Sequence, residues 1–123
     1  MAKVLVVDDE QIMLSYLSLV VHDLGHQFVC AENGKIGLEM FKTEKPDLII
    51  SDMVMPEMDG REFIESVRKL PLGKEVPIII LSGYAKIGDV ASLLEAGATY
   101  FLKKPVDLKE LQEYIKKAFN EYN

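Results

Sequence analysis

Five polar side chains in this sequence stand close to the ends of short apolar runs. They are Asp8, Asp9, Asp52, Ser82 and Lys104. Three carboxylates brought together repel one another, so such a cluster must either hold a proton at a raised pKa or bind a hard cation through its oxygens. Mg²⁺ suits two or three aspartates because it keeps several waters and pairs with phosphate oxygens. If these five side chains meet, they could bind Mg²⁺, or Mn²⁺, beside a phosphoryl group.

The residue types suggest a role for each group. No Cys or His lies among them and Ser82 has no evident base beside it, so a carboxylate is the expected nucleophile. Asp52 is the best candidate, because an in-line donor could reach it while a metal held by Asp8 and Asp9 screens the incoming charge. Lys104 could balance a carboxylate at rest and a phosphoryl oxygen after transfer, and the Ser82 hydroxyl could donate to another oxygen.

Each of these motifs is ordinary when it is taken alone. An Asp-Asp pair after a strand more often begins a turn or a helix, because Asp caps helices readily. Ser-Gly after a strand is more often a turn, and a Lys-Pro pair is equally common. The prediction therefore depends on their joint placement at the ends of successive strands.

The elements that would position these groups form an alternating pattern of five strands and five helices. The strands are expected at residues 3–7, 27–31, 48–51, 78–81 and 99–103. Alternation of this kind predicts an α/β fold, a doubly wound (βα)5 three-layer sandwich with a parallel sheet of order 2-1-3-4-5, as in flavodoxin-like proteins. The three mostly aliphatic strands should be central and the two mixed ones should be edges. In such sheets, sites form beyond the carboxyl ends of the strands.

The helices follow from apolar spacing and from their end signals. They are expected at residues 13–24, 34–41, 59–67, 86–96 and 107–119. Asp59 and Asp107 each precede a Glu by three residues, which is the spacing of a capping box. Gly25 and Gly97 are expected to end the first and fourth helices. The fourth has a glycine near its start and should be the weakest.

Composition narrows the function further. The length of 123 residues fits one domain, residues 1–123, and is too short for two. The 14 Lys and Arg against 20 Asp and Glu give a net charge of −6, which argues against direct nucleic-acid binding. No apolar run is long enough to cross a membrane and no signal-peptide pattern is present, so we expect a cytoplasmic protein. The single cysteine, Cys30, cannot form an internal disulfide.

Four motifs occur in order, namely Val-Asp-Asp-Glu, Ser-Asp-Met-Val-Met-Pro-Glu-Met-Asp-Gly, Leu-Ser-Gly and Lys-Lys-Pro. With them, nearly the whole chain closely resembles the receiver domains of two-component response regulators, a family whose chemotaxis member is known to have the 2-1-3-4-5 order. The resemblance implies that a histidine kinase or phosphotransfer protein phosphorylates Asp52. It also implies that Asp8, Asp9, Asp52 and the Val54 backbone carbonyl hold Mg²⁺. Such a domain catalyses only its own phosphoryl transfer and dephosphorylation.

The same resemblance implies a switch. Ser82 and Lys104 would contact the phosphoryl group, and the aromatic residue three positions before the lysine would change its packing. That residue is Phe101, where tyrosine is more usual, so no hydroxyl takes part. A cis peptide is expected at Lys104-Pro105. The downstream protein target should bind the face formed by the fourth helix, the fifth strand and the last helix. A monomer is expected, and a dimer on phosphorylation is left open.

Two other classes compete with this interpretation. A haloacid-dehalogenase-like phosphatase also uses Asp and Mg²⁺ on a parallel sheet, but its acids alternate after the first strand, whereas Asp8 and Asp9 are adjacent. A flavodoxin-like cofactor carrier would have to bind a phosphate against Asp8, Asp9 and Glu10, which repel anions. ATP binding is disfavoured because no Gly-rich nucleotide loop or Walker lysine is present.

Overall fold

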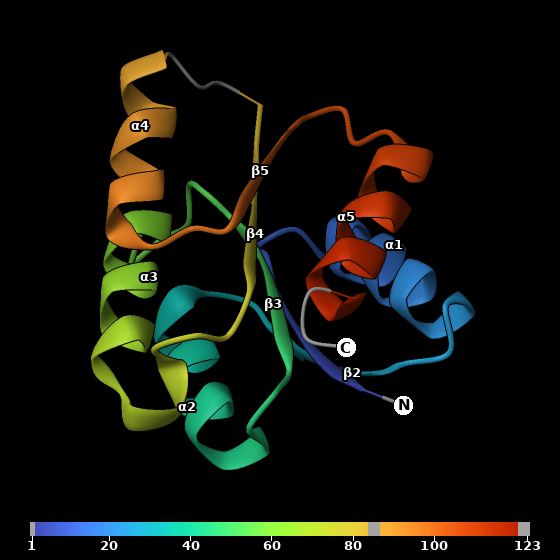
Figure 1. Ribbon diagram of the computed structural model, residues 1–123, viewed down its shortest axis with the longest axis horizontal. Coiled ribbons are helices and arrows are strands. Elements are labelled where there is room, and N and C mark those ends of the chain that lie inside the picture. The colour runs from blue at the N-terminus through green and yellow to red at the C-terminus, as the bar shows by residue number, and fades with distance from the viewer. Residues whose placement is uncertain (1, 84–86, 121–123) are drawn as a thin grey trace.

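The computed structural model describes residues 2–83 and 87–120 and shows a parallel five-stranded sheet of order β2-β1-β3-β4-β5 (Figure 1). The strands are β1 (Lys3–Val7), β2 (Gln27–Ala31), β3 (Leu48–Asp52), β4 (Ile78–Ser82) and β5 (Tyr100–Lys103). The predicted strand order is confirmed. The aliphatic strands β1, β3 and β4 are central and almost wholly buried, as strands covered on both faces must be.

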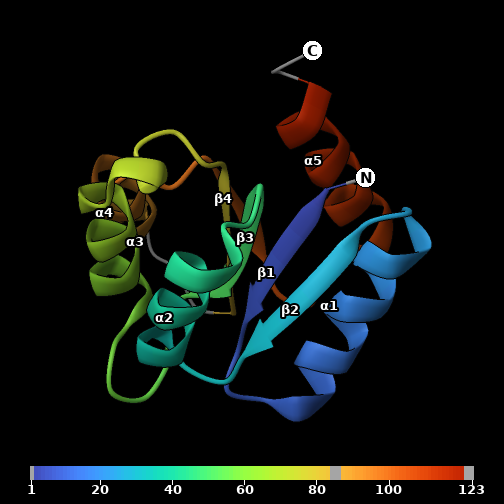
Figure 2. The ribbon, with the colours of Figure 1, turned by 90° about the horizontal axis from the view of Figure 1, so that it is seen from below.

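Helices cover both faces of the sheet. α1 (Gln11–Asp23) and α5 (Leu108–Asn120) lie on one face, and α2 (Gly34–Glu44), α3 (Gly60–Lys69) and α4 (Ile87–Ala96) lie on the other (Figure 2). A 3-10 turn, Pro71–Gly73, follows α3. Two buried apolar clusters separate in the same way, one on each face of the sheet, so the predicted three-layer sandwich is confirmed. Within the described residues, no helix combines the length and the apolar character needed to cross a membrane.

Helix starts follow the expected capping chemistry where the cap is described. Asp59 accepts a hydrogen bond from the Glu62 amide at 2.9 Å and begins α3, as predicted. α5 begins at Leu108, one residue after the predicted start. α1 begins at Gln11 instead of residue 13, because its exposed first residues fall outside the apolar periodicity that was used to find it. The predicted start of the fourth helix, residue 86, lies outside the described residues.

The predicted end of the second helix was wrong. The polar residues 42–45 are expected to end it, but α2 continues through Glu44, and Lys45 then adopts a left-handed conformation with φ 49°. These polar side chains remain on the outer side of the helix, where Lys3 pairs with Glu44 at 3.2 Å. Polarity alone therefore did not end the helix, and the chain leaves it only at the residue before Pro46.

The strand ends also differ slightly from expectation. β3 and β4 are each one residue longer than predicted, so Asp52 and Ser82 are the last residues of their strands. The Met53 amide continues the ladder by donating to the Leu81 carbonyl at 3.0 Å. β5 begins at Tyr100, because Thr99 binds the start of β4 through both its amide and its hydroxyl. The strand ends that matter for function are thus held by the sheet itself.

Arg68 of α3 joins three separate segments through their backbone carbonyls. Its guanidinium donates to Gly97 at 2.6 and 3.1 Å, to Gly73 at 2.9 Å and to Val76 at 2.6 Å. Gly97 follows α4 with φ 120°, and a Cβ at this position would lie 2.8 Å from Arg68 Nε. Glycine is therefore required both by the backbone angle and by the close approach of this side chain.

Replacing Arg68 by Ala should destabilise the protein by about 2–3 kcal/mol, because several partly buried carbonyls would lose a charged donor. Urea unfolding followed by circular dichroism measures this change. Lys69→Ala is the matched control, since Lys69 is the exposed neighbour on the same helix. Equal stabilities for the two variants would contradict the importance of this arginine.

Candidate functional site

All five predicted site residues lie along the carboxyl edge of the sheet. Asp52 ends β3 and Ser82 ends β4, while Asp8 follows β1 and Lys104 follows β5. The Asp8 amide donates to the Ala31 carbonyl at 3.1 Å, and the Lys104 amide donates to the Ser82 carbonyl at 2.7 Å. The ladder hydrogen bonds therefore fix the backbone at both flanks of the site, and the convergence predicted from strand order is observed.

The three carboxylates form one compact cluster. Asp8, Asp9 and Asp52 each contribute an oxygen, and these oxygens lie within 4.8 Å of one another. Asp8 is fully buried and Asp52 is 7% exposed, whereas Asp9 lies on the exposed rim. Two buried carboxylates and one exposed carboxylate give a site that is closed towards the protein interior and open to a ligand that arrives from solvent.

Lys104 is the cation of the site. Its Nζ lies 3.1 Å from Asp52 Oδ1 and 3.8 Å from Asp8 Oδ2. The Met53 amide also donates to Asp52 Oδ1, at 2.9 Å, so this oxygen has two donors. The Lys104-Pro105 peptide is cis, as expected. One lysine therefore spans two of the three carboxylates, and it is nearer to Asp52.

Burial disturbs the protonation of these groups. Burial raises the pKa of Asp8 to about 6; the Glu10 amide opposes this rise and the charge of Asp52 adds to it. Burial also raises the pKa of Asp52, although Lys104 acts in the opposite direction. Burial would lower the pKa of Lys104, but attraction to Asp52 and Asp8 outweighs it, and the net change is upward. A single lysine thus leaves the carboxylates incompletely neutralised.

One oxygen in the site has no hydrogen-bond donor among the described residues. Asp8 Oδ1 accepts from the Glu10 amide at 2.9 Å, but the buried Asp8 Oδ2 accepts no hydrogen bond. A buried carboxylate oxygen without a donor is costly, and Lys104 Nζ approaches it only to 3.8 Å, so a further cation would stabilise it. The cluster supplies hard oxygen ligands with net negative charge, so the residues present fit a divalent ion such as Mg²⁺.

Mg²⁺ affinity should depend on pH, because a carboxylate of this cluster must lose its proton before its oxygens can coordinate a cation. With a pKa of about 6 for Asp8, we expect affinity at least about tenfold weaker near pH 5 than near pH 7.5. Isothermal titration calorimetry with MgCl₂ at the two pH values measures this ratio. Constant affinity over this range would contradict either the raised pKa of Asp8 or its participation in ion binding.

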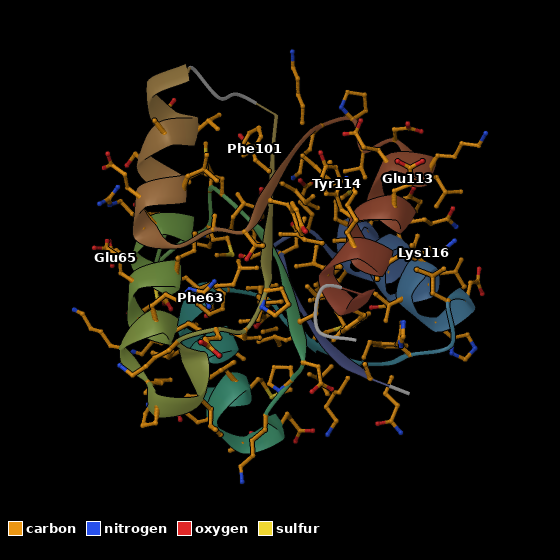
Figure 3. All side chains as sticks on the ribbon, viewed as in Figure 1. Phe63, Glu65, Phe101, Glu113, Tyr114 and Lys116 are labelled. Carbon is orange, nitrogen blue, oxygen red and sulfur yellow. The ribbon has the colours of Figure 1, made fainter. Side chains whose placement is uncertain are left out.

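The predicted switch residues lie in different surroundings. Ser82 is 2% exposed at the end of β4. Phe101 lies on the neighbouring strand β5 (Figure 3), where it is half-buried and packs against the apolar cluster on the α2, α3 and α4 face of the sheet. Phe101 is therefore neither fully buried nor fully exposed. Val54 follows β3 in an exposed loop position.

The sequence did not reveal a contact beside the site that involves Arg61. This α3 residue donates to the Ser92 carbonyl of α4 at 2.8 Å and also contacts the Ser92 hydroxyl. It pairs with Glu65 at 3.3 Å. Arg61 and Ser92 line a hollow with Val54, next to the Asp52 loop. The only sequence signal was an arginine directly after the Met-Asp-Gly motif, and nothing indicated a partner 31 residues away.

Comparison with known proteins gives consistent matches. The family model described as the response regulator receiver domain matches residues 4–116. The KDP operon transcriptional regulatory protein KdpE of Escherichia coli is 37% identical over 123 residues, which are the whole of this chain and 53% of KdpE. The chain thus spans about half the length of that relative, and 27% of the Escherichia coli regulator GlrR.

Solved structures show the same similarity. The chemotaxis protein CheY4 of Vibrio cholerae has a TM-score of 0.91 at 32% identity, covering 96% of this chain and 98% of CheY4. The receiver domain of a sensor histidine kinase from Pseudomonas aeruginosa has a TM-score of 0.89 at 26% identity, with 97% and 98% covered. That neighbour has a magnesium ion coordinated in its active-site cleft.

Proposed function

The chain belongs to the family of response regulator receiver domains of two-component systems, and from this premise we propose that Asp52 accepts a phosphoryl group with the help of Mg²⁺. The donor is a histidine kinase or a phosphotransfer protein. One observation carries the proposal: Asp8, Asp9 and Asp52 meet within 4.8 Å, with Lys104 as their cation. The buried Asp8 oxygen without a donor supports a metal in the same place.

The proposed reaction moves one phosphoryl group. A carboxylate oxygen of Asp52 forms a bond to phosphorus while the bond from phosphorus to the donor atom breaks, and the donor leaves with that electron pair. Mg²⁺, when it is bound, neutralises negative charge on the carboxylates and the phosphoryl oxygens. Asp8, Asp9 and the Val54 carbonyl would hold the ion together with Asp52. Lys104 holds Asp52 at rest and then pairs with a phosphoryl oxygen.

The charge added at Asp52 would be communicated through β4 and β5. Ser82 donates its hydroxyl to a phosphoryl oxygen, and Phe101 responds by changing how deeply its ring is buried. Because Phe lacks a hydroxyl, the two states of this residue differ in packing alone. The surface that changes is the face formed by α4, β5 and α5, where we place the downstream protein target.

The proposed role is that of a signalling domain. Residues 1–123 act as one receiver that catalyses only its own phosphoryl transfer and dephosphorylation, in the cytoplasm. Mn²⁺ can replace Mg²⁺, because it also accepts oxygen ligands. The family matches give no support to the alternative of a haloacid-dehalogenase-like phosphatase.

Incubation with acetyl phosphate tests this function without knowledge of the kinase. Intact-protein mass spectrometry should show the added mass of one phosphoryl group with MgCl₂ and none with EDTA. Hydroxylamine should remove the added mass, because an acyl phosphate is cleaved by this nucleophile. Incorporation that does not depend on the metal, or that survives hydroxylamine, would show that the site works differently.

A further inference from the structure

Two exposed apolar side chains, Leu19 of α1 and Phe28 of β2, line a groove beside the outer edge of β2, outside the phosphoryl site. Four of the eight large hydrophobic side chains that are exposed among the described residues lie on β2 or on its flanking helices: Ile12, Leu19, Phe28 and Ile36. Ile12 is 83% exposed and Leu19 is 59% exposed. Both lie on one stripe of α1, seven residues apart. The remaining four belong to four separate segments of the chain.

The backbone of β2 is open along the same edge. β2 ends the sheet and pairs only with β1 among the described strands. The Gln27 amide donates to Ala2 at 2.8 Å and the Ala31 carbonyl accepts from Asp8 at 3.1 Å, so the odd-numbered residues of this strand face β1. The amides and carbonyls of Phe28 and Cys30 therefore point away from the sheet.

This edge lacks the residues that usually prevent strands from pairing between molecules. Charged side chains, especially lysine, and proline commonly protect sheet edges. The sequence of β2, Gln-Phe-Val-Cys-Ala, has neither, and residues 11–21 of α1 carry no Asp, Glu, Lys or Arg. The opposite edge strand β5 ends with the exposed Lys103. Because the chain has a net charge of −6, a second copy is repelled least where it approaches this uncharged edge.

We propose that the β2 edge, defined here as Phe28 to Cys30 with Leu19 of α1, is a self-association surface. Two copies pair their β2 strands antiparallel about a twofold axis at Val29. Phe28 of each copy then forms hydrogen bonds with Cys30 of the other, and the two sheets join into one of ten strands. The apolar side chains of α1 and β2 become covered on both copies.

A second copy fits this edge better than an unrelated strand. An antiparallel pair brings the beginning of one strand next to the end of the other. The exposed His22, which lines the groove between α1 and β2, thereby approaches the exposed Glu32 that follows the second strand, and the twofold axis repeats this pairing. The arrangement closes on itself, because each copy uses its β2 edge and the other described edge strand, β5, carries Lys103, so association ends at the dimer.

The proposed surface is narrow, so the dimer should be weak. One strand edge and one helix stripe offer less than the roughly 800 Å² per partner that is usual for a stable complex. The surface includes no residue of the Asp52 site or of the α4, β5 and α5 face. Dimerisation should therefore occur without Mg²⁺ and without a phosphoryl donor, and its failure would leave the proposed function untouched.

Cysteine cross-linking tests the twofold axis directly. In a Cys30→Ser background, Val29→Cys should form an intermolecular disulfide under mild oxidation. Val29 meets its symmetry copy in a non-hydrogen-bonded pair, where Cβ atoms are about 4.5–5.5 Å apart. The matched control is Phe28→Cys in the same background, because that position opposes residue 30 of the other copy. Random collisions would favour the more exposed position 28, so faster cross-linking there would overturn the proposal.

Analytical ultracentrifugation tests the association itself. The apparent mass of the unmodified protein should rise from 13.9 kDa towards twice that value as concentration increases. Phe28→Lys should remain a monomer at every concentration, with an unchanged melting temperature, because position 28 is 42% exposed. A wild type that stays monomeric, a dimer that survives Phe28→Lys, or growth beyond the dimer would each refute the β2 edge as a self-association surface.

Discussion

Asp52→Asn should abolish phosphorylation by acetyl phosphate. The amide is nearly the same size as the carboxylate and can still accept from the Met53 amide, but it is not a nucleophile for phosphorus. We expect incorporation to fall at least about a thousandfold, as in other sites that lose their nucleophile. Mass spectrometry over a time course with MgCl₂ measures the rate.

Asp23→Asn is the matched control, because it removes the same charge from an exposed residue at the end of α1. It should be phosphorylated at the wild-type rate. Circular dichroism must show that both variants are folded. Continued labelling of Asp52→Asn at a wild-type rate would mean that another side chain accepts the phosphoryl group.

Asp8→Asn should have opposite effects on the metal-free and the metal-bound protein. The folded-state pKa of Asp8 is raised from 3.8 to about 6, so its folded form holds the proton more tightly than its unfolded form. The stabilisation linked to that proton is present below the unfolded pKa and is lost as pH rises through the folded value. At neutral pH the ionised Asp8 therefore destabilises the metal-free protein.

An asparagine at this position carries no charge and can still accept the Glu10 hydrogen bond. Urea unfolding in EDTA at neutral pH should show Asp8→Asn to be more stable than the wild type by about 2 kcal/mol. Added MgCl₂ should stabilise the wild type by mass action and leave the variant nearly unchanged.

Asp9→Asn separates the effect on metal-free stability from the effect on Mg²⁺ binding, because Asp9 is exposed. It should weaken the Mg²⁺ response while changing the stability in EDTA very little. A destabilised Asp8→Asn variant in EDTA would show that the carboxylate contributes favourable contacts that outweigh its burial.

The parts of the site that follow strand ends could be predicted from the sequence. Asp8, Asp52 and Ser82 each end or follow an aliphatic run, and parallel strands bring such ends to one edge whatever the details of packing. The residue at which each strand ends could not be predicted as finely, and both β3 and β4 are one residue longer than predicted. Hydrogen bonds to a neighbouring strand, such as that of Met53 to Leu81, decide where a strand stops.

Contacts between helices could not be predicted from the sequence. Arg61 and Ser92, and likewise Arg68 and Gly97, lie about thirty residues apart, and they meet only because α3 packs against α4. A local pattern contains no information about that packing. The end of α2 was missed for a related reason, since polar residues on an outward-facing turn are compatible with a continuing helix. The Val54 carbonyl as a ligand and the packing change of Phe101 stay predictions.

The arginine that holds the carboxyl end of α4 limits how this helix can respond to a charge at Asp52. Arg68 binds the Gly97 carbonyl twice and also anchors Gly73 and Val76, whereas Arg61 contacts α4 near its middle, at Ser92. A helix that is held most firmly at its carboxyl end should rotate about that end. Displacement of α4 should therefore be smallest at Gly97 and increase towards Ile87, so an angular change, and not a sliding motion, would reach a bound partner.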